Sequence, residues 1–139
     1  MFKQILVPVD FSDRNKRALD IALNLAQTSG GTIHLLHVIK LLAGDHDDEF
    51  SGFYKKLEVQ AKKRMNGLLA TFADHESHIQ SHLILGHRVR EILLFAEENE
   101  VDLIVMNSHK IDPENPDEGW GTISQKVGIL AQCPIMLVK

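Results

Sequence analysis

The chain has 139 residues, of which 44% are hydrophobic and 24% are charged, and its formal net charge is −4. This balance is typical of one ordinary globular domain over residues 1–139, and it excludes a disordered or fibrous chain. The sequence shows no basic stripe and no apolar run of the roughly 20 residues that cross a bilayer, so we expect neither nucleic acid nor a membrane as partner. One cysteine, Cys133, excludes an internal disulfide, and an N-terminus that enters a strand pattern at once leaves no room for a signal peptide. Together these features favour the cytoplasm.

The first half of the chain alternates strand and helix patterns. Residues 5–9 and 33–39 are short apolar runs rich in β-branched side chains, which predicts two strands. Between them, apolar residues recur every three or four positions, which predicts a helix that Ser12 caps and that the glycines at 30–31 end. A longer stripe of the same spacing over residues 53–72 predicts a second helix.

The second half repeats this alternation. Strands are predicted at residues 79–85, 102–106 and 134–138, with helices around residues 89–96 and 123–131. Strands that alternate with helices imply parallel pairing and right-handed crossovers. The predicted fold class is therefore α/β: a single-domain open five-stranded parallel sheet with helices on both faces.

In such a sheet, ligands bind beyond the carboxyl ends of the strands, where the strand order reverses. The ends of the first, second and fourth strands and the start of the last helix are therefore the predicted site. The candidate ligand-binding residues are Pro8, Val9, Asp10, Val38, Met106, Asn107, Lys110, Gly121 and Thr122.

Gly121 and Thr122 stand where a loop opens the last helix. A glycine there lets backbone N–H groups approach an anion, and the helix N-terminus favours negative charge. Asn107 tolerates the left-handed backbone region better than most residues, and Lys110 adds a cation that suits a phosphate. The alternative interpretation is that Thr122 only caps the helix. Asp10 also has two interpretations, a ligand contact to a ribose or adenine edge, or an anchor for the turn with Ser12.

The loop at residues 111–118 argues against a phosphate ligand. It holds four carboxylates, no cation and two prolines, so it repels phosphate and offers fewer backbone donors. A metal or another ligand on this loop is an open alternative. Trp120, next to this loop, either covers a ligand or packs on the base of the loop.

The sequence shows no convincing catalytic or metal-binding constellation. It contains no G-x-S-x-G nucleophile motif, no Walker A motif and no G-x-G-x-x-G motif. His34 and His37 are three apart on a predicted strand, so they point to opposite faces and cannot chelate one ion together. We therefore expect no enzyme and no bound metal.

Taken together, several segments resemble the universal stress protein family. They are residues 5–12, 37–38, 102–106, 108–109 and 133–138, and they occur in the family's order and at its distances over essentially the whole chain. The resemblance implies an adenine nucleotide alpha hydrolase-like fold and a homodimer that forms through the last strand. It also implies an adenine-nucleotide site for ATP or AMP.

One stretch departs from the nucleotide-binding branch of that family, which carries G-x2-G-x9-G-[ST] after its fourth strand. Here Asn107 and Lys110 replace both early glycines, and ten residues separate Lys110 from Gly121. The phosphate half of the site is therefore the altered half. Three hypotheses remain: a dimeric, non-catalytic stress-response module with a degenerate nucleotide loop, an ATP- or AMP-binding nucleotide sensor with slow hydrolysis, or a module that regulates a protein partner.

Overall fold

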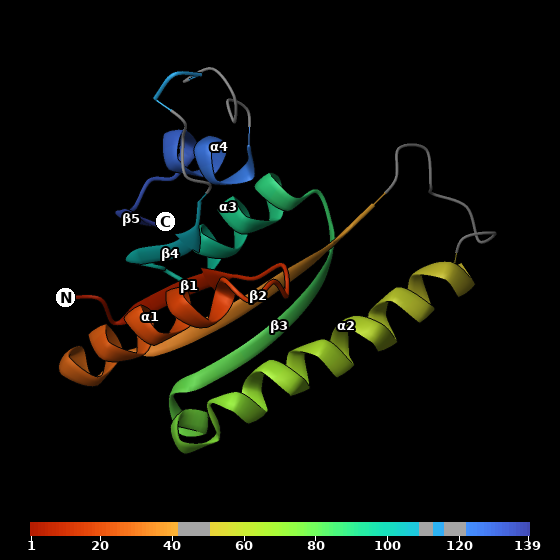
Figure 1. Cartoon of the computed structure of the whole chain (residues 1–139), viewed down its shortest axis with the longest axis horizontal. Coiled ribbons are helices and arrows are strands. Elements are labelled where there is room, and N and C mark those ends of the chain that lie inside the picture. The colour runs from red at the N-terminus through yellow and green to blue at the C-terminus, as the bar shows by residue number, and fades with distance from the viewer. Residues whose placement is uncertain (42–50, 109–112, 116–121) are drawn as a thin grey trace.

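The structure is a computed structural model that describes residues 1–41, 51–108, 113–115 and 122–139. These residues form strands and helices in nearly strict alternation, as the sequence predicts (Figure 1). In chain order the elements are β1 (Gln4–Pro8), α1 (Asn15–Ser29), β2 (Thr32–Lys40), α2 (Ser51–Thr71), the 3₁₀ segment η2 (Ala73–His78), β3 (Ile79–Gly86), α3 (Arg88–Glu98), β4 (Leu103–Asn107), α4 (Ile123–Leu130) and β5 (Ile135–Val138).

All five strands are parallel and lie in the order β3-β2-β1-β4-β5. The predicted fold class is confirmed. The chain leaves β1 toward β2 on one side and later returns to place β4 on the other side, so the strand order reverses between β1 and β4. A crevice therefore opens at the carboxyl ends of these two strands.

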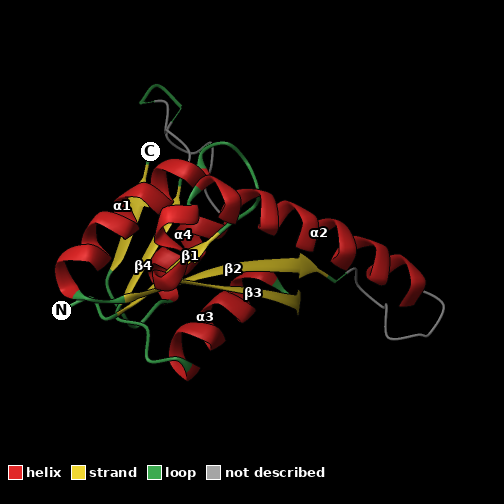
Figure 2. Ribbon diagram, turned by 90° about the horizontal axis from the view of Figure 1, so that it is seen from below, coloured by secondary structure: helices red, strands yellow, loops and turns green. Residues whose placement is uncertain are grey.

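Alternate side chains of each central strand fill one of two hydrophobic cores. Ile5 and Val7 belong to the core beneath α1 and α2, whereas Leu6 belongs to the core beneath α3 and α4. Because successive side chains of a strand point to opposite faces, one apolar run supplies both cores. Figure 2 shows α1 and α2 on one side of the sheet and α3 on the other.

The two ends of α1 compare differently with the prediction. Gly30 ends the helix with φ of 71°, in the left-handed region, and its N–H bonds to the carbonyl of Ala26, as expected. The prediction that Ser12 caps the helix is wrong. The first helical residue is Asn15, and Arg14 stands at the cap position without a capping side-chain bond. The polar residues after β1 form one further turn before the helix begins.

No helix among the described residues combines the length and the apolar character that a membrane span requires.

Candidate ligand crevice

A cavity of about 310 Å³ opens at the carboxyl ends of β1, β2 and β4, against the starts of α1, α3 and α4. The helices that line it cover both faces of the sheet, α1 on one face and α3 and α4 on the other, as expected at a reversal of strand order. The lining residues are Pro8, Val9, Asp10, Arg14, Asn15, Leu36, His37, Val38, Arg88, Ile92, Met106, Asn107, Thr122, Ile123 and Ser124.

The turn after β1 holds Asp10 at the edge of this cavity. The Asp10 carboxylate accepts the backbone N–H of Ser12 at 2.9 Å, so the turn-anchoring role predicted for Asp10 is confirmed. The next residue, Phe11, has φ of 65°, a conformation that a bulky residue rarely adopts. Its ring packs on His37, with the ring centroids 4.3 Å apart. The aromatic contact therefore helps to hold a turn that the backbone alone disfavours.

The side-chain amide of Asn107, at the first altered glycine position, forms hydrogen bonds within the protein. Its Oδ1 accepts from Nδ2 of Asn15 at 3.0 Å, and its Nδ2 donates to the carbonyl of Arg14 at 2.8 Å. Asn15 is only 2% exposed, and its Oδ1 accepts the backbone N–H of Asp10 at 3.1 Å. These bonds join the end of β4 to the turn after β1 and to the start of α1.

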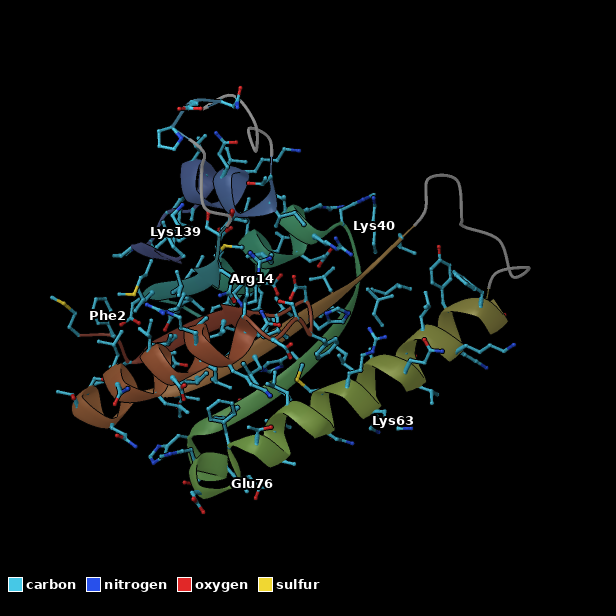
Figure 3. All side chains as sticks on the ribbon, viewed as in Figure 1. Phe2, Arg14, Lys40, Lys63, Glu76 and Lys139 are labelled. Atoms are coloured by element: carbon cyan, nitrogen blue, oxygen red, sulfur yellow. The ribbon has the colours of Figure 1, made fainter. Side chains whose placement is uncertain are left out.

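Hydroxyl groups gather where α4 begins. Thr122 is the N-cap, and its Oγ1 accepts the N–H of Gln125 at 3.3 Å. Ser124 is 6% exposed and donates to Ser108 Oγ at 3.4 Å. The Lys139 ammonium, labelled beside β5 in Figure 3, donates to the same Ser108 oxygen at 3.2 Å. The capping role predicted for Thr122 is thus confirmed, and hydrogen-bond donors lie next to it.

Two arginines and one carboxylate are the charged groups among the described residues that line the crevice. Partial burial alone would raise the pKa of Asp10. Its hydrogen bonds with Ser12, together with the positive charge of the Arg14 guanidinium, bring this pKa below the ordinary 3.8. Asp10 is therefore an ionised acceptor at neutral pH. Burial lowers the pKa of His37 below 6.5, and the Arg88 guanidinium adds to this effect. Nδ1 of neutral His37 lies 2.8 Å from the Val9 carbonyl, to which it donates.

A second histidine group lies away from the crevice. His34 is on the face of β2 opposite to His37, as predicted, and its Nδ1 lies 3.1 Å from Nε2 of His82 on β3. Its Nε2 lies 2.7 Å from Oε1 of Gln4. Burial lowers the pKa of both His34 and His82, so the pair is neutral at neutral pH and shares one hydrogen bond.

The predicted site residues that the structure describes all line this cavity: Pro8, Val9, Asp10, Val38, Met106, Asn107 and Thr122. Lys110 and Gly121 lie outside the described residues, as do Trp120 and most of the acidic loop.

The sequence interpretation missed five polar side chains that also line the crevice: Arg14, Asn15, His37, Arg88 and Ser124. Asn15 and Arg14 fall in a segment that reads as an ordinary helix start. Arg88 follows β3, a strand whose end was not assigned to the site. Asn15 lies three and four positions before the buried Ala18 and Leu19 of α1, and a polar residue on this apolar face is a signal that could have identified it.

The model of the universal stress protein family matches this chain over residues 1–139. The chain belongs to the universal stress protein family. Among curated universal stress proteins, YxiE of Bacillus subtilis is 30% identical over 150 residues, with both chains covered completely. Universal stress protein MJ0577 of Methanocaldococcus jannaschii is 29% identical over 157 residues, which cover 100% of this chain and 96% of the relative.

Solved universal stress protein structures share the fold. The structure of MJ0577 superposes with a TM-score of 0.83 at 28% identity, over 100% of this chain and 96% of that chain. A universal stress protein from Archaeoglobus fulgidus in complex with dAMP matches with a TM-score of 0.72 at 22% identity, over the full length of both chains. Another universal stress protein, in complex with cAMP, matches at 0.73 and 18% identity, over 99% of this chain and 97% of that chain.

Proposed function

We propose that this universal stress protein is a non-catalytic regulatory module that binds an adenine nucleotide in the crevice between β1 and β4. The observation that carries the proposal is the cavity that residues at the ends of three strands and at the starts of three helices line together. The complexes of two relatives with cAMP and dAMP support adenine nucleotides as the ligand class. The cytoplasmic location remains a prediction from the sequence.

The residues that line the cavity include groups that suit the base, the ribose and the phosphate of a nucleotide. Leu36, Val38, Ile92 and Met106 give apolar walls that suit a planar base. Ionised Asp10 offers an acceptor for ribose hydroxyl groups, since only part of its hydrogen-bonding capacity is used by Ser12. The hydroxyl groups at the start of α4 and the helix N-terminus suit a phosphate.

The proposal includes no catalytic step. Asp10 and His37 are the carboxylate and imidazole among the described lining residues, and each has a backbone partner in the turn after β1. Both side chains contribute to holding this turn, and we assign neither of them a role as a base for a nucleophile.

A second candidate function follows from Asn107. Its side chain occupies a glycine position of the nucleotide loop and is tied to Asn15 and Arg14. In this alternative, the rebuilt loop no longer admits a triphosphate, and the protein acts as a dimeric stress-response module without nucleotide. Thermal unfolding with and without nucleotide separates the two candidate functions.

The test is thermal unfolding of the full chain with and without Mg-ATP and with AMP. A ligand at 100 times its Kd stabilises the folded state by about 2.7 kcal/mol, which raises the unfolding temperature by several degrees. We expect Asp10→Asn to reduce this shift, because the amide oxygen still accepts from Ser12 but is a weaker acceptor for ribose hydroxyl groups than the carboxylate. Asp13→Asn, at an exposed residue outside the cavity, is the matched control. No shift at millimolar nucleotide would refute binding and leave the second candidate.

We also propose that the protein forms a homodimer through β5. This strand is the edge of the sheet next to β4, and its Met136 and Leu137 are each 37% exposed. On the adjoining α4, Ile129 and Leu130 are 72% and 57% exposed. An apolar edge strand offers unpaired backbone groups and side chains that a second copy of the same strand can cover.

A further inference from the structure

Arg14 and Arg88 enter the mouth of the crevice from opposite faces of the sheet. Arg14 precedes α1, which packs on one core, and Arg88 is the first residue of α3, which packs on the other. Both residues line the cavity although both are exposed. Figure 3 shows Arg14 near the middle of the molecule, beside the central strands.

The charge at the crevice differs in sign from the charge of the whole chain. The chain carries a formal net charge of −4, whereas the described cavity residues carry two guanidinium groups against the one carboxylate of Asp10. Each guanidinium acts on a side chain in the crevice: Arg14 helps to lower the pKa of Asp10, and Arg88 helps to lower that of His37. The mouth of the crevice therefore attracts anions in an otherwise acidic protein.

The side chain of Asn107 has at most one N–H left for a phosphate. Its amide nitrogen donates to the Arg14 carbonyl, and its oxygen accepts from Asn15. A guanidinium, in contrast, has five N–H donors in a planar fork that matches two phosphate oxygens at once. The crevice thus has a source of phosphate recognition other than loop glycines.

We propose that Arg14 and Arg88 select phosphorylated ligands in this crevice by binding the phosphate group of an adenine nucleotide from the two faces of the sheet. This assignment rests on the proposed function, because it names the residues that bind the phosphate group of the same ligand. It predicts that affinity depends on the phosphate through these two side chains.

The experiment compares AMP with adenosine by titration calorimetry on the wild-type chain and on Arg14→Gln, Arg88→Gln and the double variant. We expect the wild type to bind AMP at least tenfold more tightly than adenosine. Each single variant should reduce AMP affinity by about tenfold, the scale of a charge-assisted hydrogen bond, with adenosine affinity unchanged. In the double variant the two affinities should become nearly equal. Raising the salt concentration should weaken AMP binding to the wild type more than adenosine binding.

Matched controls come from the same two helices. Arg17→Gln on α1 and Arg90→Gln on α3 remove an exposed guanidinium that does not line the cavity, so they should leave both affinities unchanged. Arg14→Lys and Arg88→Lys keep the charge but lose the fork, and they should recover only part of the AMP preference.

The outcomes separate this assignment from the proposed function. A wild type that binds neither compound refutes nucleotide binding itself, and the assignment with it. A wild type that binds both equally, or variants that keep the wild-type AMP preference, overturns the arginine assignment while nucleotide binding stands. Controls that lose AMP affinity as strongly as the cavity variants also overturn it, since general charge would then explain the effect.

Discussion

At the scale of single residues, Asn107 shows how one substitution depends on another. It occupies a position at which the nucleotide-binding branch of the family carries glycine. Its side chain is accommodated because the buried Asn15 lies beside it and bonds to it. Asn15 in turn holds the N–H of Asp10. The three residues are far apart in the sequence or separated by a turn, yet they share one hydrogen-bonded unit at the switch between β1 and β4.

This unit predicts coupled stability effects. Asn15→Ala should lower the free energy of unfolding by about 1–3 kcal/mol, because it removes a buried amide and leaves the Asp10 N–H and the Asn107 oxygen without this part-buried partner. Asn107→Ala should lower it less, and the double variant should show a coupling energy of about 1 kcal/mol in a denaturant double-mutant cycle.

Asn24→Ala is the control for that cycle. Asn24 is exposed and its side chain donates to the Asp20 carbonyl in the same helix, so the change should stay within about 0.5 kcal/mol. Strict additivity of Asn15→Ala and Asn107→Ala would contradict the bridge between β4 and the turn after β1.

At the scale of elements, the ends of the helices depend on backbone conformation as much as on burial. Gly30 adopts the left-handed region that stops α1 and sends the chain into β2. Gly67, in contrast, lies within α2, where a methyl group would meet nothing within 4 Å. Two glycines in helical sequence patterns therefore have opposite roles, and only one of them is required by the fold.

We predict that Gly30→Ala lowers the free energy of unfolding by about 1 kcal/mol, since alanine at this positive φ is strained. Gly67→Ala should raise it by about 0.5–1 kcal/mol, because alanine reduces the entropy of the unfolded chain and has higher helix propensity. Urea unfolding of both variants beside the wild type measures the difference. A Gly30→Ala protein at least as stable as the wild type would show that the positive φ at residue 30 does not require glycine.

At the scale of the whole molecule, the strand order determines which surfaces remain open. The order β3-β2-β1-β4-β5 places the crevice at the centre and leaves β5 as an edge. The ligand site and the proposed dimer surface therefore lie on opposite sides of β4. A change at one surface can be tested without direct contact with the other.

The dimer proposal predicts that Met136→Glu produces monomers in sedimentation velocity, since a charge on each copy would face its equivalent across the two-fold axis. Val59→Glu is the control, because Val59 is 70% exposed on α2, an element outside this surface. Circular dichroism should show that both variants keep the fold. A Met136→Glu protein that sediments as the wild type does would rule out pairing through β5.

The sequence by itself determined the fold class and the place of the crevice. Apolar runs of strand length, separated by stripes of helical spacing, permit little other than a parallel α/β sheet, and each predicted strand end lies within one residue of the observed end. Since ligands bind at the reversal of strand order, the strand ends identified Pro8, Asp10, Val38 and Met106 as neighbours across one cavity.

Only the tertiary structure decided which other side chains reach that cavity. Arg14 and Arg88 come from helices on opposite faces, and Asn15 meets Asn107 across 92 positions of sequence. Local sequence patterns do not predict such tertiary contacts, because hydrophobic spacing indicates which face of an element is buried but not which residues pack against that face. The pairing His34–His82 between neighbouring strands was missed for the same reason. It depends on the register of β2 and β3, which forms only when the whole sheet packs.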